Sequence, residues 1–187
     1  SHSEVDSRIR KVRSFLRKLI YGPRSQNIHY FNSLLGETTR GEAAFYLFDH
    51  VPNSSVYAPN VEVLRRFGKA ESWSVSKCVH LPEDTLDGQL ANHRIEDVDF
   101  IKLDTQGSEL SILKGGEGAL GKASGVFLEV EFLSLYENQP LFGDVDVYLR
   151  SHGFDLVEIV RTKYWKAPFE GRFLKSRGQI VYGDVLY

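Results

Sequence analysis

The sequence lacks methionine altogether, has a single cysteine and carries almost no net charge. One cysteine, Cys78, excludes an internal disulfide and a cysteine-based metal site, and a reducing, cytoplasmic location is the default expectation. The 23 basic and 25 acidic residues give a net charge of −2. We therefore expect no nucleic-acid binding, because such domains are usually strongly basic. No apolar run approaches the roughly 20 residues that span a bilayer, so we expect no stable membrane insertion.

The absence of methionine is unusual for 187 residues. We expect that methionines of the natural protein are missing from the sequence, which would shorten some spacings by a residue or more. Ser1-His2-Ser3 resembles the remnant of a cleaved tag. Residues 8–20 predict a basic amphipathic helix, which we interpret as a packed helix with a solvated charged face; a membrane-surface or nucleic-acid role for this helix is the alternative. An oligomer is compatible with the sequence, which does not fix the oligomeric state.

The order of the predicted elements is typical of an α/β fold. After an extended piece at residues 28–35, we predict strands at residues 43–48, 73–81, 98–103, 126–132, 156–160 and 180–186, and helices at residues 61–67, 109–114 and 144–152. This alternation predicts a three-layer α/β sandwich around a mostly parallel sheet. The last strand follows a polar stretch without a clear crossover helix, so we expect it to be antiparallel, at or near an edge.

One predicted site follows the strand at residues 98–103, because ligands bind beyond the carboxyl ends of strands in open α/β sheets. Asp104 ends this apolar strand, so we expect a partly desolvated, functional carboxylate; an N-cap or a loop-bracing acid is the alternative. Lys102 lies on the same strand face, and a charge inside an apolar strand predicts a carboxylate partner. Glu109 begins a helix, where the helix dipole alone would favour an acid.

A second predicted site lies at the end of the strand at residues 126–132. Glu129 and Glu131 share one face of that strand. If this strand neighbours the one before Asp104, one sheet mouth holds three acids and Lys102, with Asp104 and Glu129 within about 8 Å of each other. Such clusters raise carboxylate pKa values and suit general-base chemistry or metal binding. Stand-alone motifs such as GxGxxG, HExxH and CxxC are absent, and the six histidines show no metal-ligand spacing.

Several blocks, in order, resemble the FkbM family of S-adenosylmethionine-dependent methyltransferases. They are residues 84–87, 99–110, 113–116, 128–132, 135–142, 153–154 and 178–186. The resemblance covers most of residues 28–187 and implies one Rossmann-like class I methyltransferase domain, with a seven-stranded sheet and helices on both faces. It further implies methyl transfer from S-adenosyl-L-methionine to a hydroxyl of a small-molecule or glycan acceptor, such as a sugar, a glycolipid or a polyketide-like compound.

The resemblance also implies site residues. The catalytic candidates are Asp104, Glu129 and Lys102. The donor-binding candidates are Asp104, Thr105 and Gln106. The candidates on the acceptor side are Ser54, Ser55, Glu131, Tyr136 and Gln139.

The sequence departs from the family at its beginning, since nothing before Ile28 resembles the glycine-rich loop that holds the donor. We therefore expect a sheet that is incomplete towards its N-terminus, with either a chain break before Ile28 or another chain covering the exposed sheet. Two alternatives stay open. One is a non-catalytic binding domain on a degenerate methyltransferase scaffold. The other is a metal-dependent hydrolase that uses Asp104, Glu109, Glu129 and Glu131.

Overall fold

The computed structural model describes residues 29–39, 41–167 and 177–187. The chain divides into two units, Ser1–Asn32 and Ser33–Tyr187, and the second carries the helices and strands named below. The predicted basic helix at residues 8–20 and the predicted break before Ile28 lie outside the described residues, and the single domain over residues 1–187 stays a prediction. Within the described ranges, no helix is both long and apolar enough to cross a membrane.

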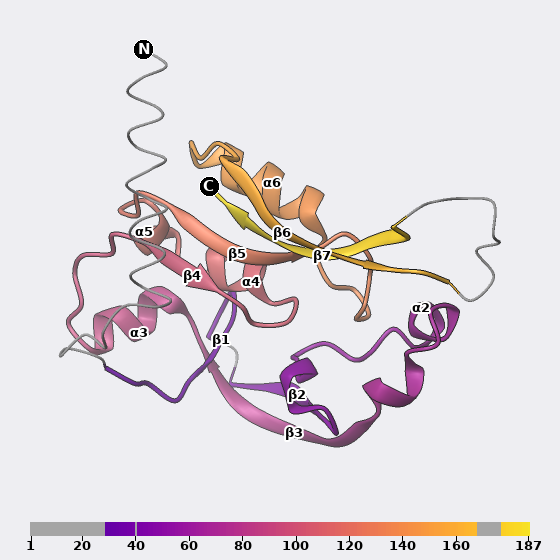
Figure 1. The fold of residues 1–187 in the computed structure, drawn as a ribbon. Coiled ribbons are helices and arrows are strands. Elements are labelled where there is room, and N and C mark those ends of the chain that lie inside the picture. The colour runs from indigo at the N-terminus through magenta and orange to yellow at the C-terminus, as the bar shows by residue number, and fades with distance from the viewer. Residues whose placement is uncertain (1–28, 40, 168–176) are drawn as a thin grey trace, which may run out of the picture. The chain divides into compact units, whose positions relative to one another are not determined.

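Short strands, helices and 3-10 turns alternate along the second unit (Figure 1). In chain order they are β1 (Leu34–Leu35), β2 (Glu42–Phe48), η1 (Val51–Asn53), α2 (Val61–Arg66), η2 (Ala70–Trp73), β3 (Val75–Asp84), α3 (Leu86–Asn92), β4 (Ile101–Leu103), α4 (Glu109–Lys114), α5 (Glu117–Leu120), β5 (Val126–Glu131), α6 (Phe142–Ser151), β6 (Glu158–Trp165) and β7 (Gln179–Leu186). The mixture confirms the α/β class.

The strands form two mixed sheets, of order β1-β3-β2 and β4-β5-β7-β6. In the larger sheet β4 and β5 are parallel, whereas β7 runs antiparallel to both β5 and β6. The prediction of an antiparallel last strand near an edge is confirmed, since β7 lies beside β6 at the end of the sheet. The described strands do not form the mostly parallel sheet that was predicted, because β7 pairs antiparallel with both of its neighbours, β5 and β6.

Most predicted elements are observed, and the departures have local causes. Strand β4 has three residues in place of the predicted six, and β3 begins at Val75 because Trp73 ends a 3-10 turn. Strand β6 begins at Glu158 and continues to Trp165 through residues that sequence reasoning left as a polar connection. Its polar side chains are tolerated because much of β6 is exposed.

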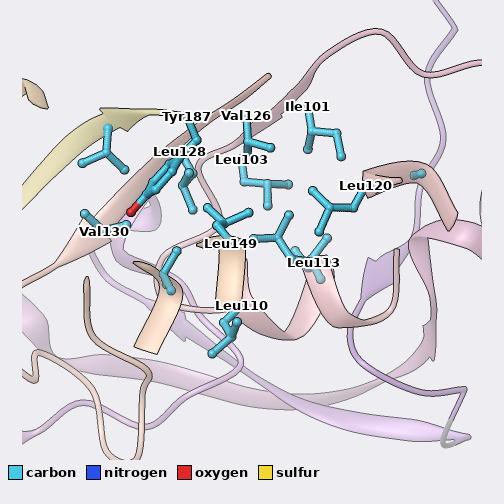
Figure 2. Packing of buried hydrophobic residues seen from close by; sticks show 14 residues of the cluster. Ile101, Leu103, Leu110, Leu113, Leu120, Val126, Leu128, Val130, Leu149 and Tyr187 are labelled. Atoms are coloured by element: carbon cyan, nitrogen blue, oxygen red, sulfur yellow. The ribbon is translucent and has the colours of Figure 1, made fainter. Parts of the chain in front are cut away.

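One face of the larger sheet is covered by α4, α5 and α6, which form a hydrophobic core with it (Figure 2). Val126, Leu128 and Val130 of β5 point into this core and are at most 1% exposed. Burying each such side chain stabilises the fold by about 1.5–3 kcal/mol. Side chains alternate along a strand, so Glu129 and Glu131 lie on the opposite face.

A second, aromatic cluster joins the segment around β2, α2 and η2 to the residues that follow β5. Phe48, Trp73 and Tyr136 pack ring against ring, with centroids 5.3 to 6.2 Å apart. Edge-on and tilted packing of this kind is favourable beyond simple burial. The cluster holds the residues that follow Glu131, so it helps to fix the surroundings of that side chain.

Candidate active site

The loop between β4 and α4 is braced by Glu109, which is 2% exposed. Its carboxylate accepts hydrogen bonds from the Thr105 backbone N–H at 2.7 Å, the Thr105 hydroxyl at 3.0 Å and the Gly107 N–H at 2.9 Å. Gln106 and Gly107 adopt positive φ angles of 56° and 100°, a region that glycine enters readily and glutamine rarely. Glu109 therefore determines the shape of the loop, which is more than a favourable dipole interaction would do.

The carboxyl ends of β4 and β5 bring Asp104 and Glu129 together. Leu103 pairs with Leu128 in parallel register, so the next residue of each strand stands beside the other. The Gln106 side-chain nitrogen donates to Asp104 Oδ1 at 3.4 Å and to Glu129 Oε1 at 3.1 Å. The two oxygens are therefore no more than 6.5 Å apart, the sum of these distances, and the predicted proximity is confirmed.

The two carboxylates differ in their exposure to water. The Asp104 side chain is 52% exposed and pairs with Lys102 Nζ at 3.5 Å. Nearly half of the Asp104 side chain is covered, in agreement with the predicted partial desolvation, and the rest is open because β4 has a strand neighbour on one side only, β5, among the described residues. The predicted Lys102–carboxylate pair is confirmed, although an exposed pair contributes little stability.

Glu129 is 8% exposed, and its pKa is raised to about 7. Burial is the largest cause, followed by the negative charges of Asp104, Asp184 and Glu109, while the Arg161 guanidinium opposes them. Arg161 donates to Glu129 Oε2 at 3.4 Å and to Asp184 Oδ2 at 2.8 Å. A carboxyl group that titrates near neutral pH, beside a cation that steadies its charged form, can act as a general base.

Glu131 lies two residues after Glu129 on β5 and is 3% exposed. Burial raises its pKa well above the usual range, and the charges of Glu109 and Glu129 raise it further, whereas the Gln139 amide lowers it. This shift favours the protonated form of the Glu131 carboxyl, in which it can donate a hydrogen bond.

Two cavities meet at this acidic face. The larger, of about 780 Å³, is lined by Glu129 and Glu131 together with aromatic side chains: Trp73, Trp165 and Tyr182. The smaller, of about 410 Å³, is lined by the polar side chains of Asp104, Thr105 and Ser108 and by apolar side chains, among them Leu34, Phe45, Leu47 and Ile112. Pro52 and Gln106 line both cavities.

A family model described as the Methyltransferase FkbM domain matches residues 13–156, most of the chain. The chain belongs to this family. No curated protein and no solved structure matches it. The matched range contains Asp104, Glu129 and every other predicted site residue of the FkbM domain. It begins upstream of residue 28, where we placed the start of the resemblance, and it ends before the closing block at residues 178–186.

Three predicted acceptor-side residues of the FkbM domain are buried and form hydrogen bonds around the loop between β4 and α4. Ser55 is fully buried, donates to the Gln106 backbone oxygen at 2.7 Å and accepts from the Tyr57 N–H at 3.1 Å. Tyr136 is fully buried, and burial raises the pKa of its hydroxyl, which donates to the Asn53 backbone oxygen at 2.9 Å. Gln139 Oε1 accepts from the Tyr136 N–H at 2.7 Å.

The remaining predicted residues lie at the two cavities. Glu131 lines the larger cavity, whereas Ser54 lines the smaller one, on the side of Asp104. Thr105 and Gln106, predicted to bind the donor, also line the smaller cavity. It stays a prediction that Thr105 and Gln106 contact the donor and that Ser54 and Glu131 contact the acceptor.

Among the described residues, no three His, Cys, Asp or Glu side chains are arranged to hold a metal ion. The oxygens of Glu109 are already taken up by three donors of its own loop. The metal-dependent hydrolase that was left open therefore finds no support in this part of the chain.

Sequence reasoning missed the charged residues that shift the pKa of Glu129, and it missed the aromatic residues in the wall of the larger cavity. Arg161 and Asp184 are paired across β6 and β7, and Asp184 is opposite Glu129 on β5. The signal was the alternation of charges along both strands, which becomes informative only once the antiparallel pairing is known. Trp73 and Trp165 carried no such signal, because an aromatic residue near a strand end is more often part of a core.

Proposed function

We propose that this FkbM domain is an S-adenosyl-L-methionine-dependent methyltransferase that methylates a hydroxyl of a sugar, glycolipid or polyketide-like acceptor. The observation that carries the proposal is Glu129, a buried carboxyl group with a pKa of about 7 in the wall of the larger cavity. Membership of the FkbM family supports a methyltransferase activity. The Glu129 carboxyl group supplies what O-methylation needs, a base that works close to neutral pH.

S-adenosyl-L-methionine, when bound, supplies an electrophilic methyl group on a positively charged sulfur. The smaller cavity has both polar and apolar lining residues that fit this donor. Asp104 offers a counter-charge for the sulfonium, and Thr105 adds polar groups beside it. The apolar walls, formed in part by Leu34 and Phe45, suit the flat adenine ring. The glycine-rich cradle expected of the family is not found among the elements described, so these residues account for part of a donor site.

The larger cavity suits a polyhydroxylated acceptor. Trp73, Trp165 and Tyr182 offer apolar ring faces, and the Glu131 carboxyl, in the protonated form that its burial favours, can donate to an acceptor oxygen. Glu129 in its ionised form would take the proton of the reacting hydroxyl, and the oxygen of that hydroxyl would accept the methyl group that the donor would supply. Arg161 stabilises the ionised base before the reaction. Holding the two reactants in adjacent cavities contributes through orientation.

We also propose that the larger sheet is part of a Rossmann-like, three-layer class I sheet. Strand β4 lies at the edge of this sheet among the described residues, with β5 as its one neighbour. Further strands would extend the sheet on the other side of β4. Helices on the acidic face would complete the third layer. The cytoplasmic location and the small-molecule or glycan acceptor stay predictions.

Calorimetry of the natural full-length protein with S-adenosyl-L-methionine tests the donor assignment. We expect one-to-one binding that weakens in Asp104→Asn and is unchanged in Asp99→Asn, a control outside the cavity. Mass spectrometry of a panel of hydroxylated acceptors then shows whether one methyl group is added. Absence of donor binding would favour the alternative, a non-catalytic binding domain, which rests on the missing glycine-rich loop.

A further inference from the structure

Gln106 occupies the wall between the two cavities and is held there by its backbone. Its φ of 56° is unusual for a residue other than glycine. The Ser55 hydroxyl fixes its carbonyl at 2.7 Å, and Glu109 braces the residues on either side of it. A rarely adopted backbone conformation that is held from several sides points to a functional position.

The side-chain amide of Gln106 connects groups that would otherwise not touch. Its nitrogen donates to Glu129 at 3.1 Å and to Asp104 at 3.4 Å, while its oxygen lies 3.2 Å from the Tyr136 hydroxyl. Ionised carboxylates only accept hydrogen bonds, so the nitrogen must face them. The amide oxygen then faces the Tyr136 hydroxyl, whose one proton is shared between the Asn53 oxygen and this amide oxygen. The carboxylates thus fix the orientation of the amide while Glu129 is ionised.

We propose that Gln106 is a positioning residue, which aims the ionised Glu129 carboxylate at the larger cavity and connects it to Asp104 at the smaller one. The inference rests on the proposed role of Glu129 as the base. It gives Gln106 a task different from donor binding, the role that the family resemblance implied.

The Gln106 amide can also form a hydrogen bond with Glu129 after Glu129 has taken up the proton of the acceptor hydroxyl. The Tyr136 hydroxyl has one proton and two neighbouring acceptors, the Asn53 backbone oxygen at 2.9 Å and the Gln106 amide oxygen. If the amide turns over, protonated Glu129 donates to the amide oxygen. The amide nitrogen then donates to the Tyr136 oxygen, whose proton goes to Asn53. Both protonation states are therefore satisfied without an orphaned buried group.

Removing the amide should change the titration of Glu129, because a hydrogen bond to the charged form favours ionisation. Charged or titratable groups face Glu129 from every neighbouring element: Asp104, Glu109, Glu131, Tyr136, Arg161, Tyr182 and Asp184. Gln106 is neutral, so its effect comes through the hydrogen bond alone and not through a change of net charge.

The test is a carbon-13 NMR titration of the glutamate side chains in the full chain, without donor or acceptor. We expect Gln106→Leu to raise the midpoint of Glu129 by about one to two pH units. Gln106→Glu is nearly isosteric, guards against a folding defect, and should raise the midpoint as well, because it replaces the donor by a carboxylate. The matched control is Gln89→Leu, which removes a 2.7 Å amide–carboxylate bond at Asp84, away from both cavities.

A Glu129 midpoint that stays at its wild-type value in both Gln106 variants would overturn the inference, as would an equal shift in Gln89→Leu. Because the titration needs no substrate, its result is independent of whether methyl transfer is found. Failure of the wild-type protein to transfer a methyl group would defeat the proposed function alone. In an active enzyme, Gln106→Leu should also move the acid limb of kcat/KM to higher pH by the same amount.

Discussion

Replacing Glu129 by glutamine should make the folded chain more stable at pH 8 while removing the proposed base. The folded state holds a proton on Glu129 up to a pKa of about 7, whereas the unfolded chain releases it near 4.5. The folded state therefore binds more protons between these values, and stability falls as pH rises through this window. Glutamine has no charge to desolvate, so the variant does not lose this stability.

The magnitude follows from the two pKa values. A difference of about 2.5 pH units corresponds to about 3 kcal/mol when the group is fully ionised in both states. Glu129 is 8% exposed, so solvent screening removes little of this amount. Losing the hydrogen bond to Arg161 offsets part of it, while Arg161 keeps its shorter contact with Asp184. We expect Glu129→Gln to gain about 2 kcal/mol over wild type between pH 5 and pH 8.

Urea unfolding at pH 5 and pH 8, followed by tryptophan fluorescence, measures this gain as a change in midpoint at constant slope. Glu96→Gln is the matched control, since Glu96 is an exposed carboxylate. Its stability should follow wild type at both pH values. A stability difference between Glu129→Gln and wild type that is the same at pH 5 and pH 8, or smaller at pH 8, would refute the reasoning.

Three further changes probe the same site. Asp104→Asn removes a negative neighbour, so the NMR titration midpoint of Glu129 should fall. Arg161→Met removes the nearby cation, so that midpoint should rise. Tyr136→Phe deletes the hydroxyl that donates to Asn53 and should cost about 1–2 kcal/mol in urea unfolding, because a part-buried acceptor loses its partner. A shift of opposite sign in either titration, or an unchanged unfolding midpoint for Tyr136→Phe, would contradict these expectations.

Local patterns were enough to predict much of this fold. Helix α4 has the bounds that were predicted, because an acid begins it and Gly115 follows its last residue. Strand β5 was recognisable from its run of apolar residues between a glycine and a change of pattern. The antiparallel direction of β7 was predicted because the sequence before it shows no clear helical pattern. Each of these signals lies in the sequence next to the element that it predicts.

The parts that were missed depend on contacts between distant segments. Asp104 and Glu129 both end apolar strands, yet one is exposed and the other buried, because β4 has fewer neighbours than β5 among the described residues. Hydrophobic periodicity cannot distinguish an outer strand from an inner one. Likewise, Arg161 reaches Glu129 only because β7 separates their strands by one position. The division into two sheets also lay beyond any local pattern.

The pH dependence of methyl transfer tests the role of Glu129 most directly. Initial rates from methyl-labelled S-adenosyl-L-methionine to an accepted hydroxyl compound would be measured from pH 5 to pH 9 for wild type, Glu129→Gln and Glu96→Gln. We predict that kcat/KM of wild type and of the control rises to a plateau with a midpoint near the Glu129 pKa of about 7. Glu129→Gln should lose this limb and fall by about 10²–10⁴-fold on the plateau. Wild-type rates in Glu129→Gln at every pH would contradict the account.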